Sequence, residues 1–172
     1  MTTIRDSAQR LLRLLDSILD FSKIESGRLE LETAPVDLRT SLDQTLEMLQ
    51  PMAVEKGVRV RHTVEGRVPT WVLGDDVRLR QILSNLLSNA IKFSERPDGQ
   101  GAVELRVDVT DTPMTASAAA GAEIWHAGRS WTRQQLTIHV SDNGIGMDPA
   151  ALGRLFQPFR QAEVSTTRRF GG

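Results

Sequence analysis

The sequence predicts an α+β sandwich, in which helices cover one face of a mixed β-sheet. Two segments, at about 38–50 and 76–93, repeat their apolar residues every three or four positions, as amphipathic helices do. Three others, at 58–64, 102–109 and 135–142, alternate apolar and polar residues, as half-exposed strands do. Because the order along the chain is helix, strand, helix, strands, and no internal repeat is present, we expect one layer of helices packed on one sheet.

The composition is that of an ordinary globular domain, and 172 residues are enough for one domain and an appendage. A net charge of -1 creates no general positive field, so we expect no nucleic-acid partner. No apolar run approaches the roughly 18–20 residues of a membrane span, and the first residues lack the apolar core of a signal peptide. The chain has no cysteine, which excludes disulfides and zinc–cysteine sites. We therefore expect a cytoplasmic segment, with membrane attachment of a longer protein left open.

The first 27 residues are predicted to form one long helix. Spacings of three and four residues produce a heptad-like seam, which consists of Ile4, Ser7, Leu11, Leu14, Ile18 and Phe21. Ala8 and Leu15 widen this seam, and Gly27 is expected to end the helix. A lone helix buries little, so we expect it to pair with a helix of another copy or of another segment. Packing against its own domain is the alternative.

Several further elements follow from local signals. Asp37 is expected to cap a helix, and Pro51 to kink or end it. The apolar stripe of this helix consists of Leu38, Leu42, Leu46 and Leu49. The stretch PTWVLGD indicates a short strand. Residues 110–132 are small, polar and without a pattern, so we expect a long connection between two strands there.

The helix predicted at 76–93 carries three polar residues beside its apolar face. At 100° per residue, Asn85, Asn89 and Lys92 fall within an arc of about 60°. Amide oxygens suit a hard cation such as Mg²⁺, whose remaining ligands are usually phosphate and water. Lys92 could neutralise a phosphate oxygen. The alternative is that these three residues are the solvated edge of an amphipathic helix.

A second candidate site follows the strand predicted at 135–142. Asp142 would lie at the end of this strand, where its carboxylate can accept a hydrogen bond from an exocyclic amine such as that of adenine. Gly144 and Gly146 permit positive φ and leave room for a flat ring. The alternative is a simple tight turn, in which Asp, Asn and Gly are common.

Taken together, these motifs resemble those of the sensor histidine kinases of two-component signalling. The ATP-binding domain of that family is shared with type II topoisomerases and a heat-shock chaperone. LSNLLSNAIKF is similar to the family's N box, DNGIGM to its first glycine box, and LFQPFRQAE to a box built on Phe156 and Phe159. LLDSILDFSKIESGRLEL resembles the second helix of the dimerisation hairpin and the linker that follows. The resemblance covers nearly the whole chain except residues 110–132.

The resemblance implies a domain organisation and a fold. Residues 1–27 would be the second helix of the dimerisation and phosphoacceptor hairpin, and residues 28–36 a linker. Residues 37–172 would be the ATP-binding catalytic domain, truncated at the second glycine box. The fold would be the two-layer α/β sandwich of the histidine kinase type, preceded by the long helix.

The resemblance also implies a role for each candidate residue. Asn85 and Asn89 would hold Mg²⁺ at the ATP phosphates, with Lys92 assisting there. Asp142 would bind the adenine amine, and Gly144 and Gly146 would shape the adenine pocket. Phe156 and Phe159 would anchor the base of a flexible lid, although both would also serve as ordinary core aromatics.

The implied reaction is transfer of the ATP γ-phosphate to a histidine, and then to an aspartate of a response regulator or receiver domain. The acceptor motif is absent from these residues, and His62, His126 and His139 do not replace it. We therefore expect a homodimeric histidine kinase whose chain, by itself, does not autophosphorylate. The first alternative is a non-catalytic module that pairs with a full-length kinase through the N-terminal helix. A topoisomerase subunit or an anti-sigma serine kinase is the second, and SILDFSKIESGRLEL argues against both.

Overall fold

The structure is a computed structural model of the chain. It describes residues 18–20, 22–110, 123–126, 128–132 and 134–148, together with residues 11, 15 and 152. Two compact units are present, Met1–Thr33 and Ala34–Gly172.

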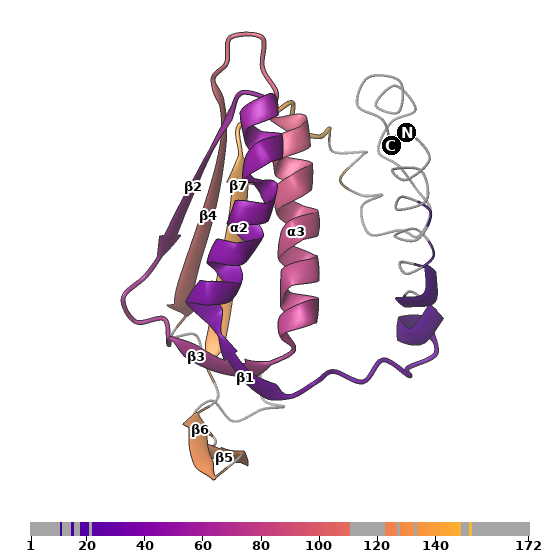
Figure 1. The fold of residues 1–172 in the computed structure, drawn as a ribbon, viewed down its shortest axis with the longest axis vertical. Helices are drawn as coiled ribbons and strands as arrows, with labels where there is room; N and C mark the ends of the chain where they lie inside the picture. Colours follow the sequence, from indigo (N-terminus) through magenta and orange to yellow (C-terminus); the bar gives the residue numbers. More distant parts are fainter. Residues whose placement is uncertain are drawn as a thin grey trace. The chain divides into compact units, whose positions relative to one another are not determined.

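The larger unit is built on a three-stranded mixed sheet with the strand order β2-β4-β7. The strands are β2 (Val58–Val64), β4 (Gly101–Thr110) and β7 (Gln135–Asp142). β4 is central, and it pairs parallel to β2 and antiparallel to β7. Two helices, α2 (Leu38–Glu55) and α3 (Asp76–Phe93), lie on the same face of this sheet (Figure 1). The predicted α+β sandwich with a mixed sheet is therefore confirmed.

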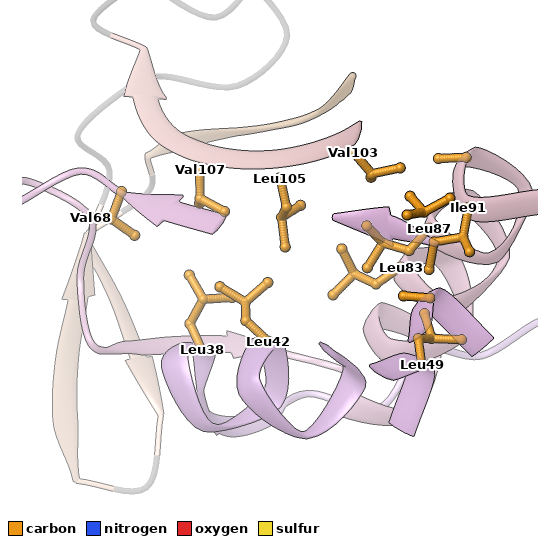
Figure 2. Close-up of a cluster of buried hydrophobic side chains, with 13 residues drawn as sticks. Leu38, Leu42, Leu49, Val68, Leu83, Leu87, Ile91, Val103, Leu105 and Val107 are labelled. Atoms are coloured by element: carbon orange, nitrogen blue, oxygen red, sulfur yellow. The ribbon is translucent and has the colours of Figure 1, made fainter. Parts of the chain in front are cut away.

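The core lies between the two helices and the sheet (Figure 2). Leu42 of α2, Leu83 and Leu87 of α3, and Leu105 and Val107 of β4 are all at most 1% exposed. They belong to one cluster of buried apolar side chains, whose other members are Leu38, Leu49, Ala53, Val58, Val68, Ala90, Ile91 and Val103. The periodic residues of the sequence thus supply the inner faces of the helices, as expected.

A separate two-stranded ribbon joins β1 (Ala34–Asp37) and β3 (Trp71–Gly74) in antiparallel register. The short strand predicted in PTWVLGD is confirmed as β3. Its partner β1 was not anticipated, because residues 28–36 were expected to be a linker. A strand of only four residues that contains Pro35 shows no strand pattern in the sequence. β1 forms because it pairs with β3.

Asp37 caps α2 as predicted, since its side chain accepts a hydrogen bond from the backbone N–H of Thr40 at 3.1 Å. Pro51 was expected to kink or end this helix, and the second alternative was wrong, because α2 continues through Pro51 to Glu55. Proline removes the hydrogen bond to the carbonyl of Glu47, but that residue is exposed, so water can satisfy its carbonyl. Burial of Ala53 beyond the proline holds the last turn on the sheet.

Residues 110–132 were expected to be a connection without regular structure, and for part of them this was wrong. β5 (Glu123–His126) and β6 (Arg129–Thr132) form an antiparallel ribbon in which Trp125 is the register partner of Ser130. Gly128, between the strands, has φ of 75°. The intervening turn therefore uses a conformation that favours glycine. Residues 111–122 lie outside the described part of the chain.

In the smaller unit, the described residues of the predicted long helix are helical at 11, 15, 18–20 and 22–25. Gly27 has φ of 65°, and the N–H groups of Gly27 and Arg28 donate to the carbonyls of Ile24 and Lys23 at 3.0 and 2.9 Å. This is a Schellman-type helix end, so the predicted termination at Gly27 is confirmed. The remaining seam residues, Ile4, Ser7, Ala8, Leu14 and Phe21, lie outside the described residues. Among the described helices, none has the length and apolarity needed to cross a membrane.

Candidate functional site

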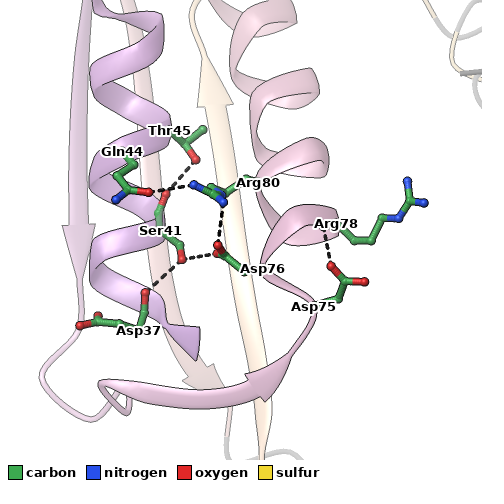
Figure 3. Close-up of polar contacts among 8 residues, drawn as sticks. All are labelled: Asp37, Ser41, Gln44, Thr45, Asp75, Asp76, Arg78 and Arg80. Atoms are coloured by element: carbon green, nitrogen blue, oxygen red, sulfur yellow. Dashed lines mark hydrogen bonds and ion pairs between the residues drawn. The ribbon is translucent and has the colours of Figure 1, made fainter. Parts of the chain in front are cut away.

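The first part of the candidate site is α3, whose N-terminal end is fixed against α2 (Figure 3). Asp75 caps α3 by accepting a hydrogen bond from the N–H of Arg78 at 3.0 Å. The carboxylate of Asp76 accepts a hydrogen bond from the hydroxyl of Ser41 in α2 and pairs with Arg80 at 2.8 Å. Arg80 also donates to the side chain of Gln44 in α2 at 2.8 Å. These polar contacts set the position of α3 on the sheet together with its buried leucines.

Asn85 and Asn89 lie on the exposed face of α3. Neither side chain takes part in a hydrogen bond with another described residue. Leu86 and Ile82, which neighbour them, are 45% and 59% exposed. α3 therefore presents two unengaged amide groups one turn apart, beside apolar surface that is also uncovered within the described part of the chain.

Lys92 lies in the last turn of α3 and is half-buried. Its ammonium group is 5.3 Å from the centroid of the Phe93 ring, which is a cation–π distance. A cation in this turn also interacts favourably with the C-terminal end of the helix dipole. Lys92 thus has a structural role, and that role is compatible with a second one toward a phosphate.

The second part of the site is the loop that begins at Asp142, the last residue of β7. Asp142 is the register partner of Val103, and Leu105 that of Val140. Because side chains two residues apart share a face of a strand, Asp142 lies on the helix-covered face with Val140. One carboxylate oxygen of Asp142, Oδ1, accepts a hydrogen bond from the N–H of Gly144 at 2.9 Å, and the residue is otherwise exposed.

Gly144 lies directly against the end of α3. A Cβ atom at this position would be 2.3 Å from the carbonyl oxygen of Phe93, so only glycine fits. The same carbonyl accepts a hydrogen bond from the N–H of Ile145 at 3.2 Å. Of the two glycines that were predicted to permit positive φ, only Gly146 has it, at 67°, whereas Gly144 is required because the backbone of Phe93 approaches it closely.

Asn143 anchors the loop to β4, a role that was not predicted. Its side chain accepts from the N–H of Ala102 at 2.8 Å and donates to the carbonyl of Gln100 at 2.9 Å. Arg96 adds a hydrogen bond to the Asn143 carbonyl at 3.2 Å. In the sequence, Asn143 is indistinguishable from an ordinary turn asparagine.

The stretch that supplies Arg96 and Gln100 is itself a hydrogen-bonded turn. The backbone N–H of Gln100 donates to Asp98 at 3.0 Å, and this bond is the main cause that lowers the pKa of the Asp98 carboxyl. Arg96 lies 3.4 Å from the same carboxylate. Asp98 thereby contacts Arg96 and Gln100, the two residues that form hydrogen bonds with Asn143.

The structure brings the two parts of the site together. Asn85, Asn89 and Phe93 are spaced by four residues, so they form one row along α3. Gly144 and Ile145 contact the C-terminal end of that row, about 12 Å from Asn85 at 1.5 Å per residue. Phe156 and Phe159, which were predicted to anchor a lid, lie outside the described residues.

Comparisons with known proteins identify the family to which the chain belongs. The family described as "Histidine kinase-, DNA gyrase B-, and HSP90-like ATPase" matches residues 74–172. The chain is 37% identical over 172 residues to signal transduction histidine-protein kinase BarA of Escherichia coli strain K12. It is 40% identical over 170 residues to sensor protein GacS of Pseudomonas syringae pv. syringae. These matches cover 100% and 99% of this chain but only 16% of each relative.

Solved structures show the same fold. Full-length ShkA, crystallised in complex with AMPPNP, superimposes with a TM-score of 0.70 at 34% sequence identity. The match covers 93% of this chain and 29% of ShkA. Histidine kinase ThkA, solved in complex with response regulator protein TrrA, matches with a TM-score of 0.59 at 17% identity, over 92% of this chain and 38% of ThkA. The chain therefore belongs to the family of histidine kinase-, DNA gyrase B- and HSP90-like ATPases, as an ATPase domain of the sensor histidine kinase type.

Proposed function

We propose that this chain binds Mg-ATP and serves as the ATP-binding part of a protein-histidine kinase. The phosphoryl group is transferred to a histidine that lies outside residues 1–172. The observation that supports this most directly is the contact between Gly144 and the carbonyl of Phe93, since it joins the Asp142 loop to the row of Asn85 and Asn89. An adenine at the loop and phosphates along the row would occupy one continuous face of α3.

Each residue has a role that its position permits. Asp142 accepts a hydrogen bond from the adenine amine with the carboxylate oxygen that Gly144 does not use. Gly144 keeps the loop close to α3, and Gly146 provides the turn that follows it. Lys92, one residue before Phe93, assists at the phosphates. Phe156 and Phe159 anchor the lid in this proposal.

Asn85 and Asn89 would hold Mg²⁺ with their amide oxygens, which suit its preference for oxygen ligands. When bound, the ion neutralises charge on the phosphate oxygens during phosphoryl transfer. The protein's own contribution is to position the nucleotide, because phosphoryl transfer requires orientation and electrostatic stabilisation more than covalent participation.

Replacing both Asn85 and Asn89 with Ala is expected to abolish the dependence of ATP affinity on Mg²⁺. Both side chains are exposed and unengaged among the described residues, so the fold should be unaffected. Calorimetric titration of ATP with and without Mg²⁺ measures the effect, which we expect to be up to about tenfold, or about 1.4 kcal/mol. The control is Gln50→Ala, which removes an exposed amide from α2. Unchanged Mg²⁺ dependence in the double variant would remove both residues from the proposed metal site.

We also expect no acid-labile phosphate on this chain after incubation with radiolabelled ATP. His139 pairs with Asp108 at 3.2 Å on the sheet face opposite Asp142, and His62 pairs with Asp43 at 3.5 Å on β2, with β4 between it and β7. Neither is placed to receive a phosphoryl group from the proposed site. Acid-labile label mapped by mass spectrometry to His62, His126 or His139 would contradict the assignment of the acceptor to a residue elsewhere.

The N-terminal unit supports a proposal about partners. Leu11, Leu15, Ile18 and Leu19 are 48–58% exposed in the described part of that unit, which fits a helix that pairs in a homodimer. A response regulator or receiver domain is the proposed phosphoryl acceptor downstream, by analogy with the complex of ThkA and response regulator protein TrrA. The alternative is a non-catalytic module that dimerises with a full-length kinase through this helix. The two differ in ATP binding, which only the first requires.

A further inference from the structure

β2 is a terminal strand of the sheet. Within the part of the chain that the structure describes, β4 lies on one side of β2 and no strand lies on the other. Its register with β4 is continuous over seven residues, from Val58 opposite Gly101 to Val64 opposite Val107, with neither a bulge nor a proline. Half of its backbone donors and acceptors therefore face outward in a regular row, which is the geometry that an added strand requires.

Two arginines on this strand have no partner among the described residues. Arg59 and Arg61 are both exposed and lie on the sheet face that the helices leave uncovered. Neither makes a hydrogen bond or an ion pair there. By contrast, the neighbouring cations of the same face are engaged: Arg106 and His139 lie 3.4 and 3.2 Å from the carboxylate of Asp108.

The sheet surface beside these arginines is open, and no described side chain of β4 or β7 engages them. A depression of about 370 Å³ is lined by Arg59, Arg61, Ala102, Glu104 and Ser141, which belong to the open sheet face, and by Val103, Asp142 and Asn143 at the same end of β4 and β7. Ala102, the register partner of Arg59, has a small side chain, so it does not hold the Arg59 guanidinium in place. Glu104 is the register partner of Arg61 but forms no ion pair with it.

The other face of β2 sets the pattern that a partner must have. Val60 and Val64 are half-buried and pack against the apolar core beneath the helices. Since side chains alternate between the faces of a strand, a strand added to β2 would place every second residue beside these valines and the others beside the arginines. His62 lies between the two valines on this face, is exposed and pairs with Asp43. The complementary sequence therefore alternates acidic residues with residues that are apolar beside the valines and polar beside His62.

Charged residues on an edge strand also discourage unwanted pairing. The two arginines would repel a basic strand, and an apolar strand would bury their charges at a cost in desolvation. An acidic strand would be attracted to them, so the arginines favour one class of partner while they exclude the others. We propose that β2 is a docking edge for an extended acidic segment of a partner protein, which adds as a strand and places carboxylates opposite Arg59 and Arg61.

The probe is a synthetic peptide, Gly-Val-Glu-Thr-Glu-Val-Gly with blocked ends, titrated into the isotopically labelled chain and followed by NMR. We expect it to shift the amide signals of residues 58–64. Its affinity should fall at least tenfold in Arg59→Glu/Arg61→Glu, whereas the peptide with both Glu replaced by Lys should bind this variant and not the wild type. Arg39→Glu, which makes the same charge change at an exposed position of α2, should bind the acidic peptide normally.

Binding of the Lys peptide by Arg59→Glu/Arg61→Glu would show that this variant is folded, so a loss of affinity for the acidic peptide could not be caused by unfolding. If the double variant unfolds, Arg59→Ala replaces it, since Arg59 is exposed and opposite a small residue, and a weakening of at least threefold is then expected. The proposal is wrong if the acidic peptide leaves the signals of 58–64 unchanged. It is equally wrong if Arg59→Glu/Arg61→Glu and Arg59→Ala bind the acidic peptide as the wild type does. The same holds if inorganic phosphate at the same concentration produces the same shifts.

Discussion

Asp142→Asn is expected to weaken Mg-ATP binding at least tenfold, by about 1.4 kcal/mol or more. The substitution leaves the shape of the side chain unchanged. In the wild type, Oδ1 accepts from the N–H of Gly144, and the second carboxylate oxygen remains available. The single oxygen of Asn would stay with Gly144, so its NH₂ group would face the adenine amine, and two donors would oppose each other. Calorimetric titration of the chain with ATP in Mg²⁺ measures the loss.

The control for this prediction is Asp43→Asn, which makes the same chemical change at an exposed position of α2. Its affinity for Mg-ATP should equal that of the wild type. If Asp142→Asn binds ATP as the wild type does while the chain remains folded, Asp142 is not the adenine-binding residue. If the wild type itself does not bind ATP, the proposed function fails for this chain, whereas the docking edge on β2 can still be tested.

Gly144→Ala is expected to lower the free energy of unfolding by about 2–4 kcal/mol and to abolish ATP binding. The added Cβ would be 2.3 Å from the carbonyl oxygen of Phe93 and 2.8 Å from its carbon, and both atoms belong to the backbone. Overpacking of this kind typically costs about 1–3 kcal/mol. Displacing the loop would also break the hydrogen bond from Ile145 to Phe93, which contributes about 1 kcal/mol. Urea denaturation measures the first effect and calorimetry the second.

Gly146 provides a matched comparison, because glycine is required there for its backbone conformation and not for lack of space. Its φ is 67° and no atom lies within 4 Å of a Cβ at this position, so Ala there strains the backbone by about 1–2 kcal/mol without a clash. Asn tolerates this conformation and should be milder than Ala at position 146. At position 144 space is limiting, so Asn should be no better than Ala. The opposite ranking at the two positions would show that the loop does not contact α3 as described.

The elements that the sequence predicted correctly are those with a strong local period. α3 and the strands β2, β4 and β7 were placed within one residue or two, because their apolar residues repeat every 3.6 or every two positions. β1 and the β5–β6 ribbon were missed, since strands of four residues carry too little pattern and exist through pairing. α2 does not end at Pro51 for a related reason, because burial of Ala53 beyond the proline outweighs the lost hydrogen bond.

For the candidate site too, some features follow from local sequence patterns and others depend on tertiary contacts. By itself, the sequence determined the residue types and their local settings: two asparagines one turn apart on α3, and an aspartate followed by glycines at the end of a strand. These follow from periodicities that act over a few residues. Only the tertiary structure decided that Gly144 meets the carbonyl of Phe93 and that Asn143 binds Ala102 and Gln100. Those contacts join residues more than forty positions apart, and they depend on the register of β4 with β7 and on the packing of α3, which no local pattern specifies.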